Sequence, residues 1–201
     1  MMLDVIDLGF DFPDKPLLQG IQFSVHSGCL VHLRGGNGAG KTTLLKLLAG
    51  LLHPAEGEIH YRGYSIHDDL ASYQQNMCYV GHKTGVNQLL TVREHCRFEL
   101  HRGCSEVAFS ELMKTCALEG MEDVVCGLLS AGQRRRVGLL RLLMSDASLW
   151  LLDEPLVALD NEAITILMDL LNNHLSRGGG VVLTSHQHLP LKQENYQEYC
   201  L

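Results

Sequence analysis

The most informative stretch of the chain is Gly35-Gly36-Asn37-Gly38-Ala39-Gly40-Lys41-Thr42, which fits the pattern G-x-x-x-x-G-K-[ST] in full. An apolar run at 30–33 precedes it, and an apolar helical pattern follows it. Glycines allow backbone N–H groups to close around phosphates, and the start of a helix adds donors that favour an anion. The alternative, a glycine-rich turn that only caps a helix, does not explain the full spacing. The loop therefore predicts a nucleotide-binding site.

Three residues at the end of this loop have expected roles. Lys41 should reach the β- and γ-phosphates, and Thr42 should supply a hydroxyl oxygen to Mg²⁺, which prefers oxygen ligands. Thr43 is expected to contact the α-phosphate. ATP and Mg²⁺ are therefore the expected cofactors.

The pattern of apolar runs predicts alternating strands and helices. Short runs bounded by turns predict strands at 21–25, 30–33, 58–61, 77–80, 149–152 and 181–184. Longer periodic segments predict helices at 41–51, 91–100, 130–144 and 161–175. The runs at 149–152 and 181–184 are unbroken, which is typical of strands that are buried on both faces of a parallel sheet. The sequence thus predicts an α/β fold with these two strands at the centre of its sheet.

Composition narrows the class of protein. With 201 residues, 46% of them hydrophobic, we expect one globular domain. The net charge of -7 provides no general electrostatic footprint for nucleic acid, so no nucleic-acid partner is expected. Seven cysteines without a C-x-x-C pair predict neither a zinc site nor a disulfide framework. The N-terminal residues do not resemble a signal peptide, and no long apolar run predicts a membrane span.

Polar residues follow the two central strands. Asp153 is expected on the Mg²⁺ side of the site, and Glu154 is placed to orient or deprotonate the water that attacks the γ-phosphate. His186 follows the strand at 181–184, so it should emerge at the same edge of the sheet and donate a hydrogen bond to the γ-phosphate. The alternatives are two acids that merely cap a strand end and a structural loop histidine.

A second motif precedes the predicted helix at 130–144. The segment Leu129-Ser130-Ala131-Gly132-Gln133 strongly resembles the signature motif of ABC (ATP-binding cassette) ATPases. In that family Ser130, Ala131, Gly132 and Gln133 would contact the ATP of a partner subunit, although Ser130 is equally suited to be a helix N-cap. The segment ending in Asp160 is similar to the D-loop of the family, which contributes to the dimer interface.

The resemblance to ABC ATPases covers essentially the whole chain. It implies a P-loop NTPase fold of the ABC type, in which a central mostly parallel sheet is joined by an antiparallel β-subdomain and a helical subdomain. One domain would span 1–201, with the helical subdomain at about 84–146. It also implies a head-to-tail dimer that sandwiches two ATP molecules. The second ABC ATPase subunit of this dimer is expected to be another copy of this chain.

Two positions qualify the resemblance. Phe12 aligns with the aromatic residue that stacks on adenine in the family, but packing within the β-subdomain is an equally good interpretation. His82 stands where the family has a glutamine that touches Mg²⁺ or water. Because histidine both donates and accepts hydrogen bonds, His82 either replaces part of that contact or marks its loss.

Three segments, at 34–51, 128–137 and 149–155, are most similar to the ATPase subunits of the cytochrome c maturation (haem exporter) system. That resemblance implies integral membrane permease subunits as partners and a peripheral position on the cytoplasmic side of the bacterial inner membrane. ATP hydrolysis would drive haem delivery or release of a haem-loaded chaperone, while the chain itself has no C-x-x-C-H haem motif. The ATPase of another ABC importer or exporter, and a nucleotide-gated scaffold without transport, remain alternatives.

Overall fold

The computed structural model describes residues 1–12, 15–83, 85–99, 106–187, 189 and 196–201. The chain divides into two compact units, and each is described by itself. The first unit contains residues 1–82, 147–155 and 171–201, and the second contains 83–146 and 156–170. Among the residues that the structure describes, no helix is long and apolar enough to cross a membrane.

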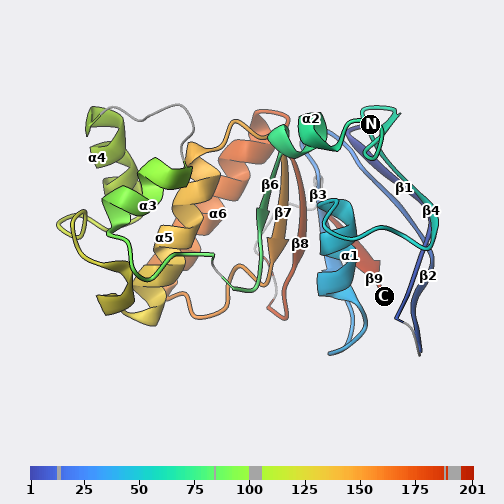
Figure 1. Ribbon diagram of the computed structural model, residues 1–201, viewed down its shortest axis with the longest axis horizontal. Coiled ribbons are helices and arrows are strands. Elements are labelled where there is room, and N and C mark those ends of the chain that lie inside the picture. The colour runs from blue at the N-terminus through green and yellow to red at the C-terminus, as the bar shows by residue number, and fades with distance from the viewer. Residues whose placement is uncertain (13–14, 84, 100–105, 188, 190–195) are drawn as a thin grey trace. The chain divides into compact units, whose positions relative to one another are not determined.

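A five-stranded parallel sheet forms the centre of the first unit (Figure 1). All side chains of its strands β7 and β8 are buried, as their unbroken apolar sequences predict. Since the strands are parallel, their carboxyl ends meet at one edge of the sheet, where ligands bind in such folds. In spatial order the strands are β6 (Met77–Val80), β7 (Leu149–Asp153), β8 (Gly180–Thr184), β3 (Leu30–Arg34) and β9 (Tyr196–Cys200).

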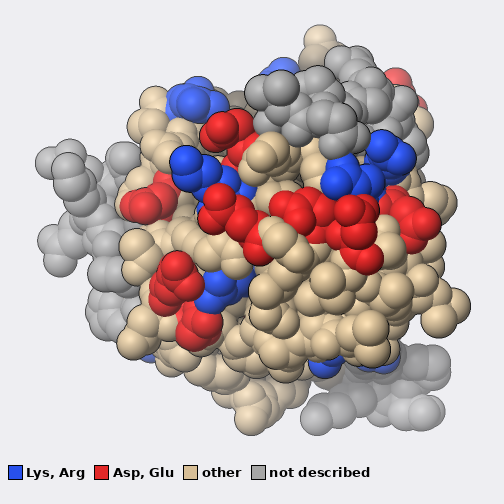
Figure 2. All heavy atoms as spheres, turned by 90° about the vertical axis from the view of Figure 1, so that its left-hand side faces the viewer, with Lys and Arg blue, Asp and Glu red and all other residues tan. Residues whose placement is uncertain are grey.

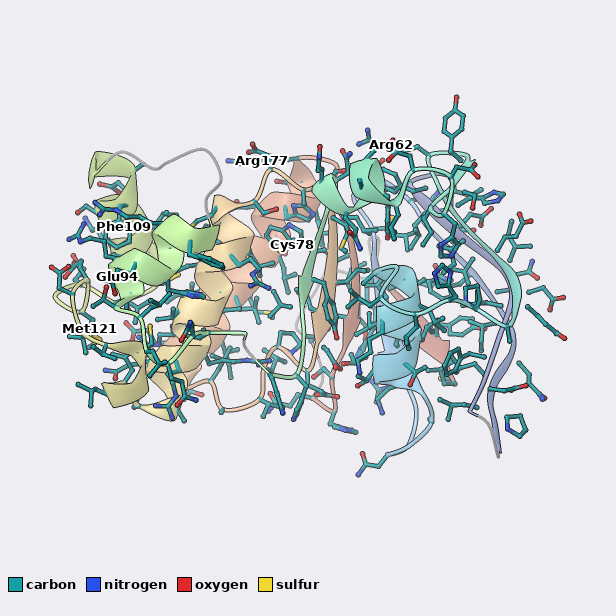
Figure 3. All side chains as sticks on the ribbon, in the orientation of Figure 1. Arg62, Cys78, Glu94, Phe109, Met121 and Arg177 are labelled. Carbon is teal, nitrogen blue, oxygen red and sulfur yellow. The ribbon has the colours of Figure 1, made fainter. Side chains whose placement is uncertain are left out.

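A four-stranded antiparallel sheet completes the first unit, together with helices α1 (Lys41–Leu48) and α2 (Leu70–Gln75). One hydrophobic core contains residues of both sheets and the four leucines of α1, so the helix that follows the phosphate loop is fixed by apolar burial. Cys78 of β6, labelled in Figure 3, is also buried. The antiparallel strands are, in spatial order, β2 (Lys15–Val25), β1 (Leu3–Phe12), β4 (Glu56–Tyr61) and β5 (Tyr64–Ser65).

The second unit is helical and has its own core. Phe109, labelled in Figure 3, lies in this core, and the guanidinium of Arg93 covers its ring at 4.8 Å. A short 3₁₀ helix, Cys126–Leu128, leads towards α5. The helices are α3 (Val92–Glu99), α4 (Glu106–Thr115), α5 (Ala131–Met144) and the first part of α6 (Asn161–Ser176), whose last turns belong to the first unit.

The predicted fold class is confirmed, since a parallel sheet, an antiparallel sheet and helices are all present. Several elements have no counterpart among the predicted ones: β1, β5, β9, α2 and α4. The predicted strand at 21–25 is the end of the much longer β2, whose register with β1 is interrupted by irregularities. The predicted helix at 41–51 stops early because Gly50, with φ of 66°, takes the left-handed conformation that ends helices.

Candidate functional site

The phosphate loop joins β3 to α1. Gly40 is the N-cap of α1 with φ of 99°, and a Cβ there would lie 2.7 Å from a methyl carbon of Leu18, so only glycine fits without movement. No side chain caps this end of the helix, which leaves its first N–H groups directed at the loop. The Lys41 ammonium donates to the carbonyl oxygens of Gly35 at 2.8 Å and Gly36 at 3.0 Å. The loop therefore presents backbone donors and a cation together.

Asp153, the last residue of β7, connects the phosphate loop to the centre of the sheet. Its carboxylate accepts hydrogen bonds from the Thr42 hydroxyl at 2.9 and 3.2 Å and from the buried Thr184 hydroxyl at 3.0 Å. Asp153 is only 1% exposed, and these hydroxyls compensate for the loss of water around its charge. A hydroxyl and a carboxylate thus lie side by side at the start of α1.

Glu154 follows in an uncommon backbone conformation. Its φ of 51° lies in the left-handed region, where a residue with a Cβ is strained, and its N–H donates to the Thr184 hydroxyl at 2.8 Å. The Glu154 Oε1 atom lies 3.6 Å from Nε2 of His186. His186 is mostly exposed whereas Glu154 is largely buried, so the acid is held by the fold and the histidine faces solvent.

These residues surround one cavity of about 400 Å³ at the carboxyl edge of the parallel sheet. The predicted phosphate-loop residues from Asn37 to Thr43, the two acids and His186 contribute to its wall, whereas Gly35 and Gly36 do not. His82, which is exposed, also lines it. Phe12 ends β1, but its side chain lies outside the described part of the chain. Among the residues that the structure describes, the lining is Leu17, Asn37, Gly38, Ala39, Gly40, Lys41, Thr42, Thr43, His82, Asp153, Glu154 and His186.

The signature residues belong to the second unit. Ser130 is the N-cap of α5: its hydroxyl accepts from the Gln133 N–H at 3.1 Å, and the Gln133 side-chain oxygen accepts from the Ser130 N–H at 2.8 Å. Ser130 and Ala131 are exposed, whereas Gly132 is partly buried. A Cβ at Gly132 would meet only the Ala158 carbonyl, at an ordinary 3.6 Å. The chain's own packing thus leaves room for a side chain at this glycine.

Asp160 is tied to α5 within the same unit. Its carboxylate accepts from the Ala163 N–H at 2.9 Å and from the buried guanidinium of Arg136, which also contacts Glu162 at 3.1 Å. The Ala163 amide and Arg136 together hold the pKa of Asp160 below its usual value. Asp160 therefore caps α6 and is held in place as an anion.

Sequence reasoning missed two contributors to the site. Thr184 binds both Asp153 and the Glu154 backbone. The feature of the sequence that could have identified it is a hydroxyl residue at the end of an apolar strand. Leu17 forms part of the cavity wall. It lies in β2, where no pattern in the sequence links it to the phosphate loop.

A phosphate loop after one parallel strand, with two acids at the end of a second and a histidine after a third, defines the class of P-loop nucleotide-binding proteins. Comparison with known proteins narrows this class. Residues 18–157 match the family model described as ABC transporter. The cytochrome c biogenesis ATP-binding export protein CcmA of Legionella pneumophila (strain Lens) is 54% identical over 200 residues, with all of both chains covered.

Solved structures of ABC transporter subunits are similar to this chain. The ATP-binding subunit of an ABC transporter has a TM-score of 0.83 at 30% identity, covering 92% of this chain and 80% of that one. A bacterial ABC transporter cassette described as dimeric has a TM-score of 0.80 at 25% identity, covering 92% and 88%. The chain belongs to the ABC transporter family and, within it, to the ATP-binding export proteins of cytochrome c biogenesis. It is accordingly an ATP-binding protein and an ABC-type ATPase.

Proposed function

We propose that this chain hydrolyses ATP, in the cavity at the carboxyl edge of its parallel sheet, to power membrane proteins in cytochrome c biogenesis. The observation that carries the proposal is the convergence of the phosphate loop, Asp153, Glu154 and His186 on one cavity. Lys41 and the N–H groups of the loop would hold the phosphates, and Thr43 would contact the α-phosphate. Phosphoryl transfer depends mainly on positioning and electrostatic stabilisation, which such an arrangement supplies.

Glu154 and His186 are the residues that we assign to the hydrolytic step. The Glu154 carboxylate would orient a water and accept its proton as it attacks the γ-phosphate. The Nε2 atom of His186, 3.6 Å from that carboxylate, would donate to the γ-phosphate. Since the backbone of Glu154 is fixed by Thr184, its carboxylate needs little reorganisation.

The site has donors that suit Mg²⁺. The Thr42 hydroxyl lies within 2.9 Å of the Asp153 carboxylate, and such hard oxygen donors beside a phosphate loop are what this ion prefers. We assign Thr42 and Asp153 as its ligands, with His82 as a further contact in place of the usual glutamine. When bound, the ion would neutralise charge on the β- and γ-phosphate oxygens.

A dimer would complete the site. Ser130, Ala131, Gly132 and Gln133 stand at the start of α5, and we propose that they bind the ATP held by a second subunit, expected to be another copy of the chain. Gly132 supports this assignment, because the chain's own packing does not require a glycine there although glycine is a poor helix former. A related bacterial cassette is described as dimeric. Asp160 would then lie in the loop at the dimer interface.

We infer that the second unit docks onto permease subunits at the cytoplasmic face of the bacterial inner membrane. Leu89, Phe98 and Leu128 of this unit are 86, 76 and 81% exposed. The Gly127 N–H donates to the Gln88 carbonyl, which holds the segments of Leu89 and Leu128 together. Figure 2 shows many acidic side chains on the side of the molecule that bears α3 and α4. Exposed apolar side chains with a polar rim are typical of protein interfaces.

The process that ATP hydrolysis serves would be haem delivery, or release of a haem-loaded chaperone, during cytochrome c biogenesis. The support is the 54% identity, over the whole chain, to a cytochrome c biogenesis ATP-binding export protein. We propose that the partners carry the haem. The whole chain, 1–201, would act as one ATPase domain whose helical subdomain, at about 84–146, contacts those partners.

The test combines turnover with partner capture. Tagged Glu154→Gln should hold ATP in the dimer, so it should lose ATP turnover and retain membrane proteins after solubilisation with ATP and Mg²⁺. Asp169→Asn, which removes an exposed acid on α6, is the matched control and should behave like the wild type. Recovery of an unrelated permease by mass spectrometry would leave only the general ATPase function standing.

A nucleotide-gated scaffold without transport is the second candidate. The observation that favours it is His82, which lines the cavity where the family has a glutamine. Equal, very low turnover by the wild type and Glu154→Gln would support the scaffold, whereas turnover that only the wild type shows excludes it.

A further inference from the structure

A histidine is completely buried in the middle of β3. His32 has 0% exposure and pairs with Leu183 of β8 on one side and with Glu198 of β9 on the other. A polar ring in such a place is costly unless its nitrogens find partners. Both do: Nε2 lies 2.9 Å from the Ser185 carbonyl oxygen, and Nδ1 lies 2.6 Å from the Tyr196 hydroxyl. His32 thus connects β3 through polar contacts to β9 and to the residue that follows β8.

The partners of His32 determine its tautomer. A carbonyl oxygen only accepts, so the proton of neutral His32 must be on Nε2 and must be donated to Ser185. Nδ1 is then an acceptor for the Tyr196 O–H. The Tyr196 hydroxyl also lies 2.8 Å from the Glu198 carboxylate, which Arg34 contacts at 3.0 Å. The single phenol proton is therefore shared between two acceptors.

The charged groups that face His32 act in opposite directions. Burial lowers its pKa most strongly and Arg34 lowers it further, while the Ser185 carbonyl, Glu198 and Glu154 raise it. The pKa of Tyr196 is raised to about 12, mainly by burial and by the nearby Glu198. Neutral His32, with its proton on Nε2, is thus the form expected near neutral pH, and that form donates to Ser185.

Ser185 lies between the residue that binds the two acids of the site and the histidine beside them. It follows Thr184, whose hydroxyl binds Asp153 and the Glu154 backbone, and it precedes His186. The Ser185 hydroxyl accepts from the Gln187 N–H at 2.9 Å, which shapes the turn on the other side of His186. His186 itself is 59% exposed, so the packed core does not fix it. Its distance from Glu154 therefore depends on where the Ser185 backbone is held.

We propose that His32 is a positioning residue for ATP hydrolysis: by binding the Ser185 carbonyl it fixes the loop that places His186 beside Glu154. Tyr196 of β9 holds the other side of the His32 ring through its contact with Nδ1. The inference rests on the role proposed above for His186, and it adds to that role a buried network that reaches the edge strand of the sheet. A displacement of about 1 Å at a reacting group is enough to cost up to about a hundredfold in rate.

Two substitutions separate positioning from packing. His32→Gln keeps a side-chain N–H that reaches towards the Ser185 carbonyl, whereas His32→Leu fills the space without a donor. We expect His32→Leu to lower kcat of the full chain at least about tenfold with KM for ATP changed less than about twofold, and His32→Gln to restore most of kcat. His174→Leu is the matched control, because His174 packs on Trp150 and against Gly179 at the opposite end of β8.

A double-mutant cycle tests the route through His186. If His32 acts only by placing that residue, His32→Leu should cause no further loss of kcat in a His186→Ala background. Equal loss in both backgrounds would overturn the proposal, as would wild-type kcat in His32→Leu. Should His32→Leu not fold, the same cycle with Tyr196→Phe, which removes the partner of Nδ1, gives the answer.

Nitrogen-15 NMR of the full chain checks the geometry without reference to activity. The expected spectrum of His32 is that of the neutral ring with the proton on Nε2, and a proton on Nδ1 at neutral pH would overturn the proposal. If the spectrum is as expected but His186→Ala hydrolyses ATP like the wild type, the role proposed for His186 fails while the network of His32 stands.

Discussion

Removing the hydroxyl of Thr184 should break the side-chain links between β8 and the two acids of the site. Thr184→Val keeps the shape of the side chain but loses the hydrogen bond from the Glu154 N–H at 2.8 Å and the one to Asp153 at 3.0 Å. The first is worth about 0.5–1.5 kcal/mol and the second, to a carboxylate, about 1.5–3 kcal/mol. We therefore expect the free energy of unfolding to fall by about 2–4 kcal/mol, since both contributions are lost together.

The assay is thermal unfolding measured beside steady-state ATP turnover. A loss of about 3 kcal/mol in a chain of this size corresponds to a fall in Tm of roughly 6–12 °C. Turnover measured well below Tm should drop at least about tenfold, because Glu154 has φ of 51° and loses the contact that holds its strained backbone. Thr184→Ser keeps the hydroxyl and is the control. Equal kcat for the valine and serine variants would refute the reasoning.

Three further predictions concern strain, space and charge. Glu154→Gly should raise the free energy of unfolding by about 1 kcal/mol, because glycine accepts a positive φ, while abolishing turnover; a fall in stability would contradict this. Gly40→Ala should weaken ATP binding, measured by titration, because its Cβ would lie 2.7 Å from Leu18. At Gly38 a Cβ would meet no atom within 4 Å, so Gly38→Ala should bind ATP more tightly than Gly40→Ala. The pKa of His32 is lowered from 6.5 on folding, so the unfolded chain binds the proton more readily and stability should fall as pH drops below about 6.5. Urea unfolding at pH 7.5 and 5.5 should show a smaller pH effect in His32→Gln.

The central elements could be predicted because short stretches of the sequence mark them. The phosphate loop contains its own conformational signal in Gly40, and unbroken apolar runs mark β7 and β8 as buried on both faces. The acids at the end of β7 could be placed at the site because parallel strands bring their carboxyl ends to one edge. For such residues, the local sequence predicts the same position in the fold that the long-range geometry imposes.

Other elements depend on partners that are far away in the sequence. β9 reads Tyr-Gln-Glu-Tyr-Cys and is mostly exposed or partly buried, so only its pairing with β3 makes it a strand. β1 has irregular register with β2, which blurs the alternation of apolar residues that marks a strand. His32 lies inside a predicted strand, but nothing local shows that its two nitrogens meet Ser185 and Tyr196.

The segment Thr184-Ser185-His186 explains why these distant partners matter. Its first residue faces Asp153 at the matching position of β7, its second gives a carbonyl to β3, and its third approaches Glu154. Three consecutive residues are thus held by two neighbouring strands, one on each side of β8. A shift of β3 would move the Ser185 carbonyl, and a shift of β7 would move Thr184. The distance between His186 and Glu154 therefore depends on how β3, β7 and β8 are aligned with one another. For this reason a buried histidine in β3 can influence chemistry at the end of β7.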